Sequence, residues 1–508
     1  MQHSKNLVKK VKKMKYFKST LILLLFGCSL SSCKKIADLQ KDPAAVYNPA
    51  PKLLFTGILM RSYDAPWSED HRHNQYMTQN EAYYAGQPYG WTSGSFDTPY
   101  GILRDVYRME IEASKTAELS AAYMTMAKFF KAYFFARTTE MFGDIPLTEA
   151  LQGESVSNFT PKYNTQLEVY QQVLNWLEEA NNELAILKGK GSMLEGDLFY
   201  NGKPEQWQKL VNSFKLRVLI SLSKRADDSA VLRIKERFAE LLSDPAKYPL
   251  IVENKDNFQL LYNNINTYPL WPADGVIIKK DVRNTLGATY LNILKTSQDP
   301  RLLIQASPAS SLPFDPLHPF EAYNGGKTGD LQSTLLKQAA EGQLSMINFD
   351  YWLASPSGLP AIQLGASEVQ FALAEGINRG WANGDAALRF QSGINQSMQF
   401  YGVSQDKINL FLQANPYKGD NVEGLKQILT QKYVAFFENS GKQAFFEQRR
   451  TGIPEFGVGP SNANNNQIPK RWAYPKTEYT TNETHLKEAL QRQFNGSDTQ
   501  NDVIWLIK

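Results

Sequence analysis

One stretch of the chain predicts the fold most directly: it reads MAKFFKAYFFARTTEMFGDIPLTEAL and runs from Met126 to Leu151. Apolar side chains such as Phe130 recur in it at helical spacing, so a helix is expected from about Ser120. Gly143 suits the left-handed residue just past a helix end, and Pro146 prevents the helix from resuming. The stretch therefore predicts a long helix that stops at Gly143.

Two more helices are expected directly after it. Asn164 or Thr165 can cap the first, whose apolar positions lie three, four and seven residues apart on a single stripe: Leu167, Tyr170, Leu174, Leu177 and Leu184. The second carries the stripe Trp207, Leu210, Val211, Phe214 and Val218. Because Trp176 and Trp207 lie on helices, we assign both indoles to the core.

Helical patterns also dominate the carboxyl-terminal third, at residues 367–378, 385–400 and 423–450, the last closed by Gly452 and Pro454. Alternation of period two is scarce, and residues 276–279 are the best strand candidate. The fold class expected is therefore mainly α, with little β structure.

Long segments rich in Pro, Gly, Ser and Asn separate these helices, at residues 63–100, 307–358 and 457–475. Long loops in a compact protein are usually functional or disordered, and the aromatic content of these argues against disorder. The sequence shows no clean 34-residue repeat. No linker divides the chain into independent domains, so residues 51–508 are expected to form a single helical domain.

The amino terminus predicts export with a lipid anchor. Seven lysines lie within the first 18 residues, and residues 21–26 form an apolar run too short for the roughly 20 residues of a membrane span. The sequence LSSC that follows resembles a bacterial lipobox, so residues 1–32 are expected to be a signal peptide and Cys33 the acylated residue. Cys28 is the alternative anchor, although the bulky Phe26 disfavours it. The remaining alternative is that both cysteines are apolar fillers.

Cleavage before Cys33 changes the charge of the chain. It removes seven of the 55 basic residues and leaves 48 against 51 acidic ones, a net charge of −3. Nothing then favours nucleic-acid binding, which needs a persistent basic face. Residues 33–50 become a polar, lipidated tether, and no intramolecular disulfide is possible.

Several further segments resemble, in the same order, the segments of a known protein family. They are residues 161–184 and 197–225, then SEVQFALAEGINRG from Ser367, QSGINQSMQFYGV from Gln391, QKYVAFFENSGKQAFFEQRRTGIPEF from Gln431, IPKRWAYPKTEYTTNETHLKEAL from Ile468 and the terminal VIWL. Together with the opening stretch they resemble the SusD/RagB family of outer-membrane nutrient-binding lipoproteins over nearly all of the mature chain. Within them, Arg449 and Arg450 are expected to serve the scaffold by satisfying carbonyls near a helix end.

The resemblance implies a scaffold of TPR-like helical pairs covered by irregular ligand-binding loops. It also implies a partner, a SusC-like TonB-dependent β-barrel transporter on which the lipoprotein sits as a lid. The location implied is the outer membrane, with the protein lipid-anchored and facing the cell surface. Lys34 and Lys35 depart from the acidic residues that often follow the anchoring cysteine, which leaves the leaflet open.

A glycan would suit the aromatic loops, because sugar C–H faces pack on rings while hydroxyls bind amides and carboxylates. The ring candidates are Trp67, Tyr89, Trp91, Tyr268, Trp271, Tyr323 and Trp352. Asn80, Asp274 and Asn324 are the polar candidates. Many of the nine Trp and 25 Tyr must instead fill the core.

The hypothesis that the protein is an enzyme has little support, since the chain has no HExxH, GxSxG or glycine-rich phosphate loop. His71 and His73 near Glu69 and Asp70 are interpreted as part of a solvated polar loop rather than a metal site. No cofactor is expected. The leading hypothesis is a non-catalytic glycan-binding protein that serves a transporter, and the alternatives are a peptide-binding protein, a structural lid with little affinity of its own, and, most weakly, a hydrolase.

Overall fold

The computed structural model describes residues 49–78, 89–91, 93–272 and 285–508. Ala50–Lys508 forms one unit. Its helices are α3 (Pro51–Leu59), α4 (Glu69–His73), α5 (Asp97–Ser114), α6 (Ala117–Phe142), α7 (Gly153–Val156), α8 (Gln166–Gly189), α9 (Pro204–Ser221), α10 (Ile234–Ser243), α11 (Ala288–Thr296), α12 (Leu302–Gln305), α13 (Gln332–Ala340), α14 (Phe349–Trp352), α15 (Ala366–Asn378), α16 (Ala386–Phe400), α17 (Gln405–Ala414), α18 (Val422–Ala435), α19 (Gln443–Thr451), α20 (Glu478–Thr481) and α21 (Glu483–Phe494). The expectation of a mainly helical protein is confirmed.

Short 3₁₀ helices and strands join these helices. The 3₁₀ helices are η2 (Leu222–Arg225), η3 (Ala230–Leu232), η4 (Asn254–Asp256), η6 (Pro319–Ala322) and η7 (Trp505–Ile507). Strand β1 (Ile145–Pro146) pairs antiparallel with β2 (Tyr163–Asn164), and β3 (Phe258–Leu260) pairs antiparallel with β4 (Ala361–Leu364). The strand candidate at 276–279 lies outside the described residues.

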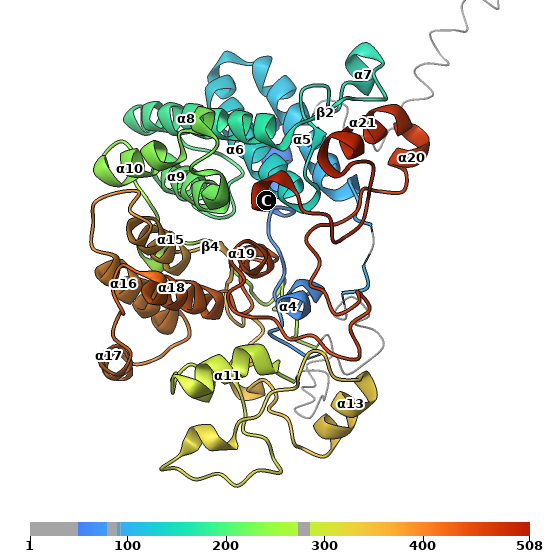
Figure 1. The fold of residues 1–508 in the computed structure, drawn as a ribbon. Helices are drawn as coiled ribbons and strands as arrows, with labels where there is room; N and C mark the ends of the chain where they lie inside the picture. The colour runs from blue at the N-terminus through green and yellow to red at the C-terminus, as the bar shows by residue number, and fades with distance from the viewer. Residues whose placement is uncertain (1–48, 79–88, 92, 273–284) are drawn as a thin grey trace, which may run out of the picture. The chain divides into compact units, whose positions relative to one another are not determined.

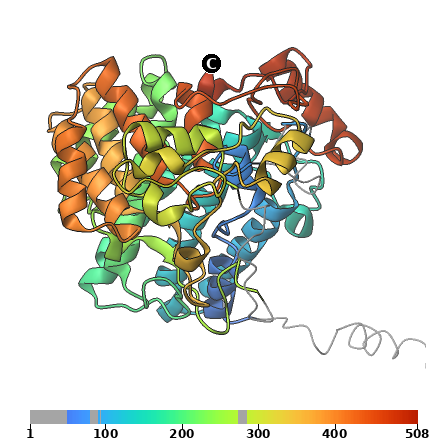
Figure 2. The same cartoon turned by 90° about the horizontal axis from the view of Figure 1, so that it is seen from below.

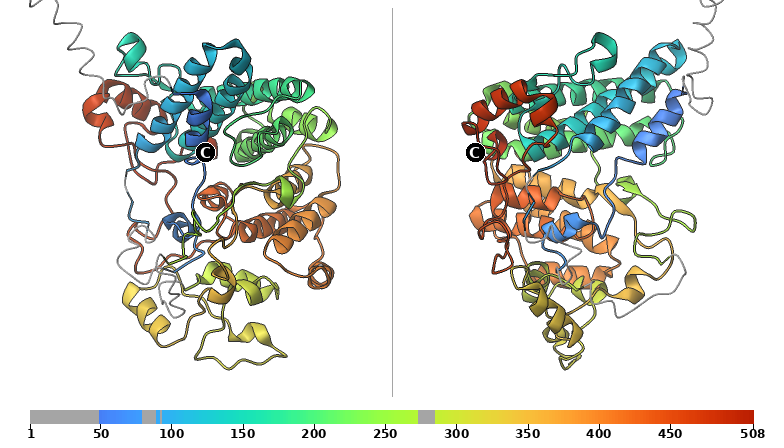
Figure 3. Two further views of the ribbon diagram at one scale, coloured as in Figure 1. Left: turned by 180° about the vertical axis from the view of Figure 1, so that it is seen from behind. Right: turned by 90° about the vertical axis from the view of Figure 1, so that its right-hand side faces the viewer.

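Helices that follow one another along the chain pack in pairs. α5 packs on α6, α6 on α8 and α8 on α9, while α15 packs on α16, α18 and α9. Figure 1 shows α5, α6, α8 and α9 in the upper part of the molecule, α15, α16 and α18 at mid-height, and α11 and α13 at the lower end. From below, the helices of residues 366–435 gather on the side opposite the carboxyl-terminal helices α20 and α21 (Figure 2). Figure 3 shows the same order from behind and from the right-hand side.

The opening stretch forms the centre of the upper layer. Because most side chains from Ala122 to Phe142 are buried, α6 is surrounded by neighbouring helices rather than lying on the surface. Its end at Gly143, with φ +96°, is as expected. Asp144 then accepts the backbone N–H of Gln166 at 2.8 Å, so the GDIP turn also anchors the start of α8.

The predicted cap of α8 is confirmed. The Thr165 hydroxyl accepts the N–H of Glu168, and the Glu168 carboxylate accepts the N–H of Thr165, which is a capping box. Trp207 is buried as assigned, whereas Trp176 is half-buried and stacks on Phe135 with ring centroids 5.8 Å apart.

The prediction of one continuous helix over residues 423–450 is wrong. It divides into α18 and α19, because Glu438, Ser440 and Gly441 adopt left-handed backbone conformations between them. The N–H of Ser440 donates to the carbonyl of Ile362 in β4 at 2.8 Å, which holds the break against the sheet. Two of the expected loops are also shorter than predicted, because 63–100 contains α4 and the start of α5 and 307–358 contains α13 and α14.

Arg449 and Arg450 serve the scaffold mainly through contacts with other helices, although Arg450 also pairs with Glu447 in its own helix. Arg449 donates to the carbonyls of Glu140, in the last turn of α6, and Lys470, both at 2.8 Å. The guanidinium of Arg450 donates two hydrogen bonds to the carboxylate of Glu375 in α15, with nitrogen–oxygen distances of 2.6 and 3.0 Å. The RRTG motif therefore joins α19 to both helical layers.

Candidate functional site

Four of the predicted ligand residues come together around Trp67. Its ring meets that of Trp352 edge to face, with centroids 5.0 Å apart, and its indole Nε1 donates to the Tyr268 hydroxyl at 2.8 Å. The Tyr268 carbonyl accepts the N–H of Trp271 at 2.8 Å. Tyr262 completes this group, with its ring 5.4 Å from that of Tyr268. We call these five residues the aromatic cluster.

The members of the aromatic cluster differ in exposure. The rings of Tyr268 and Trp352 are 1% exposed and form its floor. Trp67 and Trp271 are only half-buried. The Tyr262 hydroxyl has no hydrogen-bond partner within the described residues. The cluster therefore combines two half-buried tryptophans with a buried aromatic base.

The buried carboxyl of Glu438 contacts the aromatic cluster through the backbone of Trp67. The backbone N–H of Trp67, whose φ is +62°, donates to Glu438 Oε2. Burial raises the pKa of the Glu438 carboxyl to about 8, although this hydrogen bond and Arg72 act in the opposite direction. His71 Nε2 lies 3.6 Å from the same carboxyl, and burial lowers the pKa of His71 to about 4. At neutral pH both groups are therefore mainly uncharged, and their contact is not an ion pair.

The interpretation of residues 69–73 as a solvated polar loop is wrong. These residues form α4, and His71, Arg72 and His73 are buried, because aromatic and polar side chains from distant segments enclose the helix. Asp70 forms an ion pair with Lys442 at 2.8 Å, next to the break between α18 and α19. Over the described ranges, no group of three or more His, Cys, Asp or Glu side chains is arranged to hold a metal ion.

Tyr89 and Trp91 belong to a different aromatic group. The buried Tyr89 hydroxyl donates to the carbonyl of His73 at 2.8 Å, and Trp91 stacks on Trp472 with centroids 4.9 Å apart and ring planes 7° apart. The ring of His73 covers Trp91 at 4.5 Å. Trp91 is half-buried, and its neighbours already occupy much of its ring.

The remaining predicted residues lie elsewhere. Tyr323 is buried, and its carbonyl accepts the Lys295 ammonium at 3.0 Å. Asn324 is exposed, and its side-chain amide donates to the carbonyl of Gln343 at 2.9 Å. Asn80 and Asp274 lie outside the described residues. Tyr89, Tyr268, Tyr323 and Trp352 are buried, whereas Trp67, Trp91 and Trp271 are half-buried and Asn324 is exposed. Ligand contact by these residues stays a prediction.

Sequence reasoning missed Tyr262 and Glu438. Tyr262 lies six residues before Tyr268, in a segment whose aromatic content was a usable signal. Glu438 carried no such signal, since its role depends on the break between α18 and α19.

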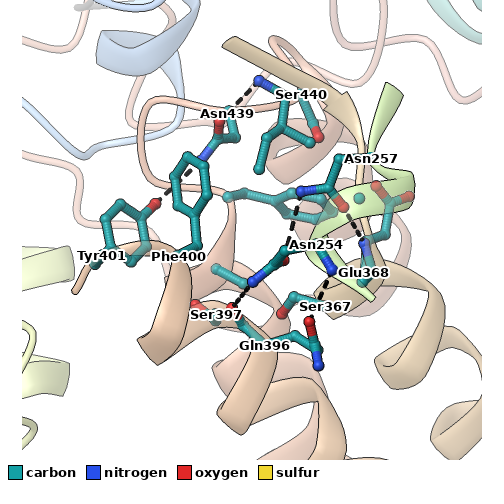
Figure 4. A pocket seen from close by; sticks show the side chains of 15 residues that line it. Asn254, Asn257, Ser367, Glu368, Gln396, Ser397, Phe400, Tyr401, Asn439 and Ser440 are labelled. Atoms are coloured by element: carbon teal, nitrogen blue, oxygen red, sulfur yellow. Dashed lines mark hydrogen bonds between the residues drawn. The ribbon is translucent and has the colours of Figure 1, made fainter. Parts of the chain in front are cut away.

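A small pocket beside α15 and α16 can be excluded as a ligand site. Its volume is about 20 Å³, which holds about one water molecule. Figure 4 shows that the amides lining it form hydrogen bonds with other side chains and with the backbone. Asn254 Nδ2 donates to the carbonyl of Gln396 at 2.8 Å, and Asn439 Nδ2 donates to the Tyr401 hydroxyl at 3.1 Å. These polar groups stabilise the packing of the two helices.

A family model described as "Starch-binding associating with outer membrane" matches residues 40–475. The chain belongs to the SusD-like family. Members of the SusD-like family are binding proteins and not enzymes, and the family is associated with the outer membrane. Among curated proteins, none matches this sequence.

Solved structures agree with this assignment to the SusD-like family. A Bacteroides vulgatus outer-membrane protein, described in connection with nutrient binding, is 32% identical with a TM-score of 0.78, over 91% of this chain and 100% of its own. Two SusD homologues from Bacteroides fragilis also cover 91% of this chain. One is 31% identical with a TM-score of 0.79 over 99% of its own length, and the other is 30% identical with a TM-score of 0.81 over 100%.

Within the described residues, none of the helices of this SusD-like protein combines the length and apolarity needed to cross a bilayer.

Proposed function

We propose that this SusD-like protein captures oligosaccharides at the cell surface and delivers them to a SusC-like TonB-dependent β-barrel transporter for nutrient uptake. The observation that carries the proposal is the aromatic cluster, in which Trp67, Tyr268, Trp271 and Trp352 converge while two indoles stay partly exposed. The family's description as starch-binding supports a carbohydrate ligand.

The chemistry of the cluster suits a sugar. Indole faces present large rigid areas for the C–H groups of a pyranose and lose little conformational entropy on binding. Since Tyr268 and Trp352 lock the base, the indole positions are set before the ligand arrives, which lowers the entropic cost of binding.

The membrane part of the proposal rests on the sequence. Acylation of Cys33 would hold the protein at the outer membrane, with residues 33–50 as a tether between the lipid and the helical domain that follows. A β-barrel partner would then bind a protein that is already confined to its membrane, which raises the effective concentration of each for the other.

Isothermal titration calorimetry against a panel of linear oligosaccharides tests ligand binding, using residues 34–508. We expect at least one glycan to bind with a free energy of about −4 to −8 kcal/mol, which corresponds to millimolar to micromolar affinity. Trp271→Ala should weaken that affinity by at least tenfold. Trp505→Ala is the matched control, because Trp505 is also half-buried but lies in η7 near the carboxyl terminus.

The outcomes of the titration separate the alternatives. Absence of binding across the glycan panel would contradict the proposal. A barrel that co-purifies with the protein from its native host, in the absence of any ligand affinity, would instead favour the structural-lid role.

A further inference from the structure

The segment that carries Trp67 is tied to the helical scaffold at Asp64. The Asp64 N–H donates to Gln363 Oε1 at 2.7 Å, and the Asp64 carbonyl accepts Gln363 Nε2 at 3.0 Å. The Asp64 carboxylate also pairs with Arg137 of α6 at 2.6 Å. Gln363 lies in β4 and is buried. One end of the segment is thus held by two elements of the scaffold, β4 and α6.

At Trp67, the segment is held by the break between α18 and α19. The Trp67 N–H donates to Glu438 Oε2, and the Phe437 ring meets the Trp67 indole edge to face with centroids 6.1 Å apart. Trp67, with φ +62°, and Glu438, with φ +56°, both have left-handed backbones, which non-glycine residues rarely adopt. Such conformations persist only where the surrounding contacts impose them. We call the hydrogen bond between Trp67 and Glu438 the latch.

The groups around the Glu438 carboxyl compensate a negative charge poorly. From α4, His71 Nε2 lies 3.6 Å from Oε2, and Arg72 contributes a positive charge. Glu438 Oε1 has no hydrogen-bond partner in the described part of the chain. Three hydroxyls from other segments also interact with the carboxyl, those of Tyr76, Tyr268 and Tyr401. Burial raises the pKa of each of these hydroxyls, so all three stay uncharged at neutral pH.

A proton on Glu438 therefore favours the latched state. Burial raises the pKa of this carboxyl from 4.5 to about 8. A state in which the carboxyl reached water would bind the proton less tightly than the latched state does. By linkage, the stability of the latched state relative to such an open state is greatest below pH 4.5 and falls as pH rises to about 8.

We propose that Glu438 is a positioning residue for the ligand site, and that loss of its proton to solvent opens the latch and weakens ligand binding. The proposal rests on the proposed function, because it assumes that the ligand contacts Trp67. In the latched state, the Trp67 indole donates to the Tyr268 hydroxyl and packs against Trp352. When the carboxyl ionises and turns toward water, the Trp67 N–H loses its acceptor and the indole is no longer fixed in the aromatic cluster.

The first measurement needs no ligand. Hydrogen–deuterium exchange of residues 63–68 is compared between wild-type residues 34–508 and the same chain with Glu438→Gln, at pH 6 and at pH 8.5. Glutamine keeps an acceptor for the Trp67 N–H but does not titrate. At a given pH the intrinsic exchange rate of this segment is the same in both proteins. We expect faster exchange in the wild-type protein at pH 8.5 and similar exchange at pH 6.

The second measurement is the pH dependence of affinity for the linear oligosaccharides of the calorimetric panel. We expect the wild-type affinity to fall by at least about threefold between pH 6 and pH 8.5, because the latched state loses its proton over this range. Glu438→Gln should show no such decline. Glu438→Ala, which removes the acceptor, should bind more weakly than Glu438→Gln at both pH values.

Glu69→Gln is the matched control for the titration. Glu69 lies at the start of α4, two residues from Trp67, but its side chain is 56% exposed. Removing its charge should leave the wild-type decline in affinity unchanged. Circular dichroism at both pH values checks that every variant is folded, so that a change in affinity reports on the ligand site.

A wild-type affinity that is constant between pH 6 and pH 8.5 would overturn the proposal. An equal decline in Glu438→Gln would also overturn it, since another group would then be titrating. Equal exchange of residues 63–68 in both proteins at pH 8.5 would exclude the latch whether or not a glycan binds. Absence of glycan binding at pH 6, together with the expected difference in exchange, would instead refute glycan capture and support the latch itself.

Discussion

The indole Nε1 of Trp67 donates a 2.8 Å hydrogen bond to the hydroxyl of Tyr268, a residue 201 positions away along the chain. This bond joins the segment before α4 to the loop that follows β3. The floor of the aromatic cluster thus depends on two loops that are far apart in the sequence.

Trp67→Phe tests that bond. Phenylalanine keeps a ring against Trp352 but leaves the buried Tyr268 hydroxyl without its donor, so we expect a loss of about 1–3 kcal/mol in the free energy of unfolding. Urea denaturation provides the measurement. The double variant with Tyr268→Phe should lose less than the sum of the two single variants, and strict additivity would show that the two groups do not interact.

Glu438→Gln tests the buried acid below Trp67. Because burial raises the pKa of Glu438 from 4.5 to about 8, the folded protein keeps a proton that the unfolded chain releases. The stability that this group contributes therefore falls as pH rises from about 4.5 to about 8. The variant should lack this decline and be relatively more stable than the wild-type protein at pH 9 than at pH 5, as measured by thermal unfolding.

His71→Gln provides the opposite control for that experiment. Burial lowers the pKa of His71 from 6.5 to about 4, so its contribution to stability is lost as pH falls through this range. The variant should change the stability profile only below about pH 6.5. A profile for Glu438→Gln that parallels the wild-type profile from pH 5 to pH 9 would refute the role assigned to the carboxyl.

Arg450→Met tests the link between α19 and α15. Burial alone would raise the pKa of Glu447, but Arg450 and Lys432 lower it to about 2, and Arg450 also contacts the buried Glu375. Without Arg450, two buried carboxylates lose a shared partner, at a cost of about 3–5 kcal/mol. The loss should be smaller near pH 4, where the carboxyls of the variant protonate more readily.

Arg61→Met serves as the comparison for Arg450→Met. Arg61 pairs with Asp105 in a partly exposed ion pair, whose removal should cost no more than about 1 kcal/mol. If both variants were destabilised to the same extent, the buried network would not carry the stability assigned to it.

Cys33→Ser tests the lipid anchor. In the native host, the wild-type protein should incorporate an alkyne-labelled fatty acid and fractionate with the outer membrane, and the variant should do neither. Cys28→Ser should behave as the wild-type protein does. The reverse pattern, with labelling lost only in Cys28→Ser, would place the anchor at Cys28.

Local chemistry explains which parts of the fold could be predicted. The end of α6 at Gly143 and the cap of α8 at Thr165 follow from interactions within a few residues, so periodicity and capping signals were sufficient. The division between α18 and α19 was missed, although Asn439, Ser440 and Gly441 form a local turn signal within residues 423–450. A contact with β4, more than 70 residues earlier in the chain, also holds this break.

The aromatic residues show the same limit. Sequence pattern identified Trp67 and Trp352 as ring candidates, but composition alone cannot separate a ring in the floor from a ring at the surface. Burial separates them, since Trp352 is enclosed by Trp67, Tyr401 and Phe437 while Trp67 remains half-exposed.

By itself, the sequence determined the helical class, the end of α6, the cap of α8 and membership in a family of binding proteins, because periodicity, capping signals and short motifs depend on residues close together in the chain. Only the tertiary structure decided which aromatic residues are buried and why α4 is enclosed. These properties depend on contacts between segments hundreds of residues apart, whose free energies become favourable only when the whole chain has packed.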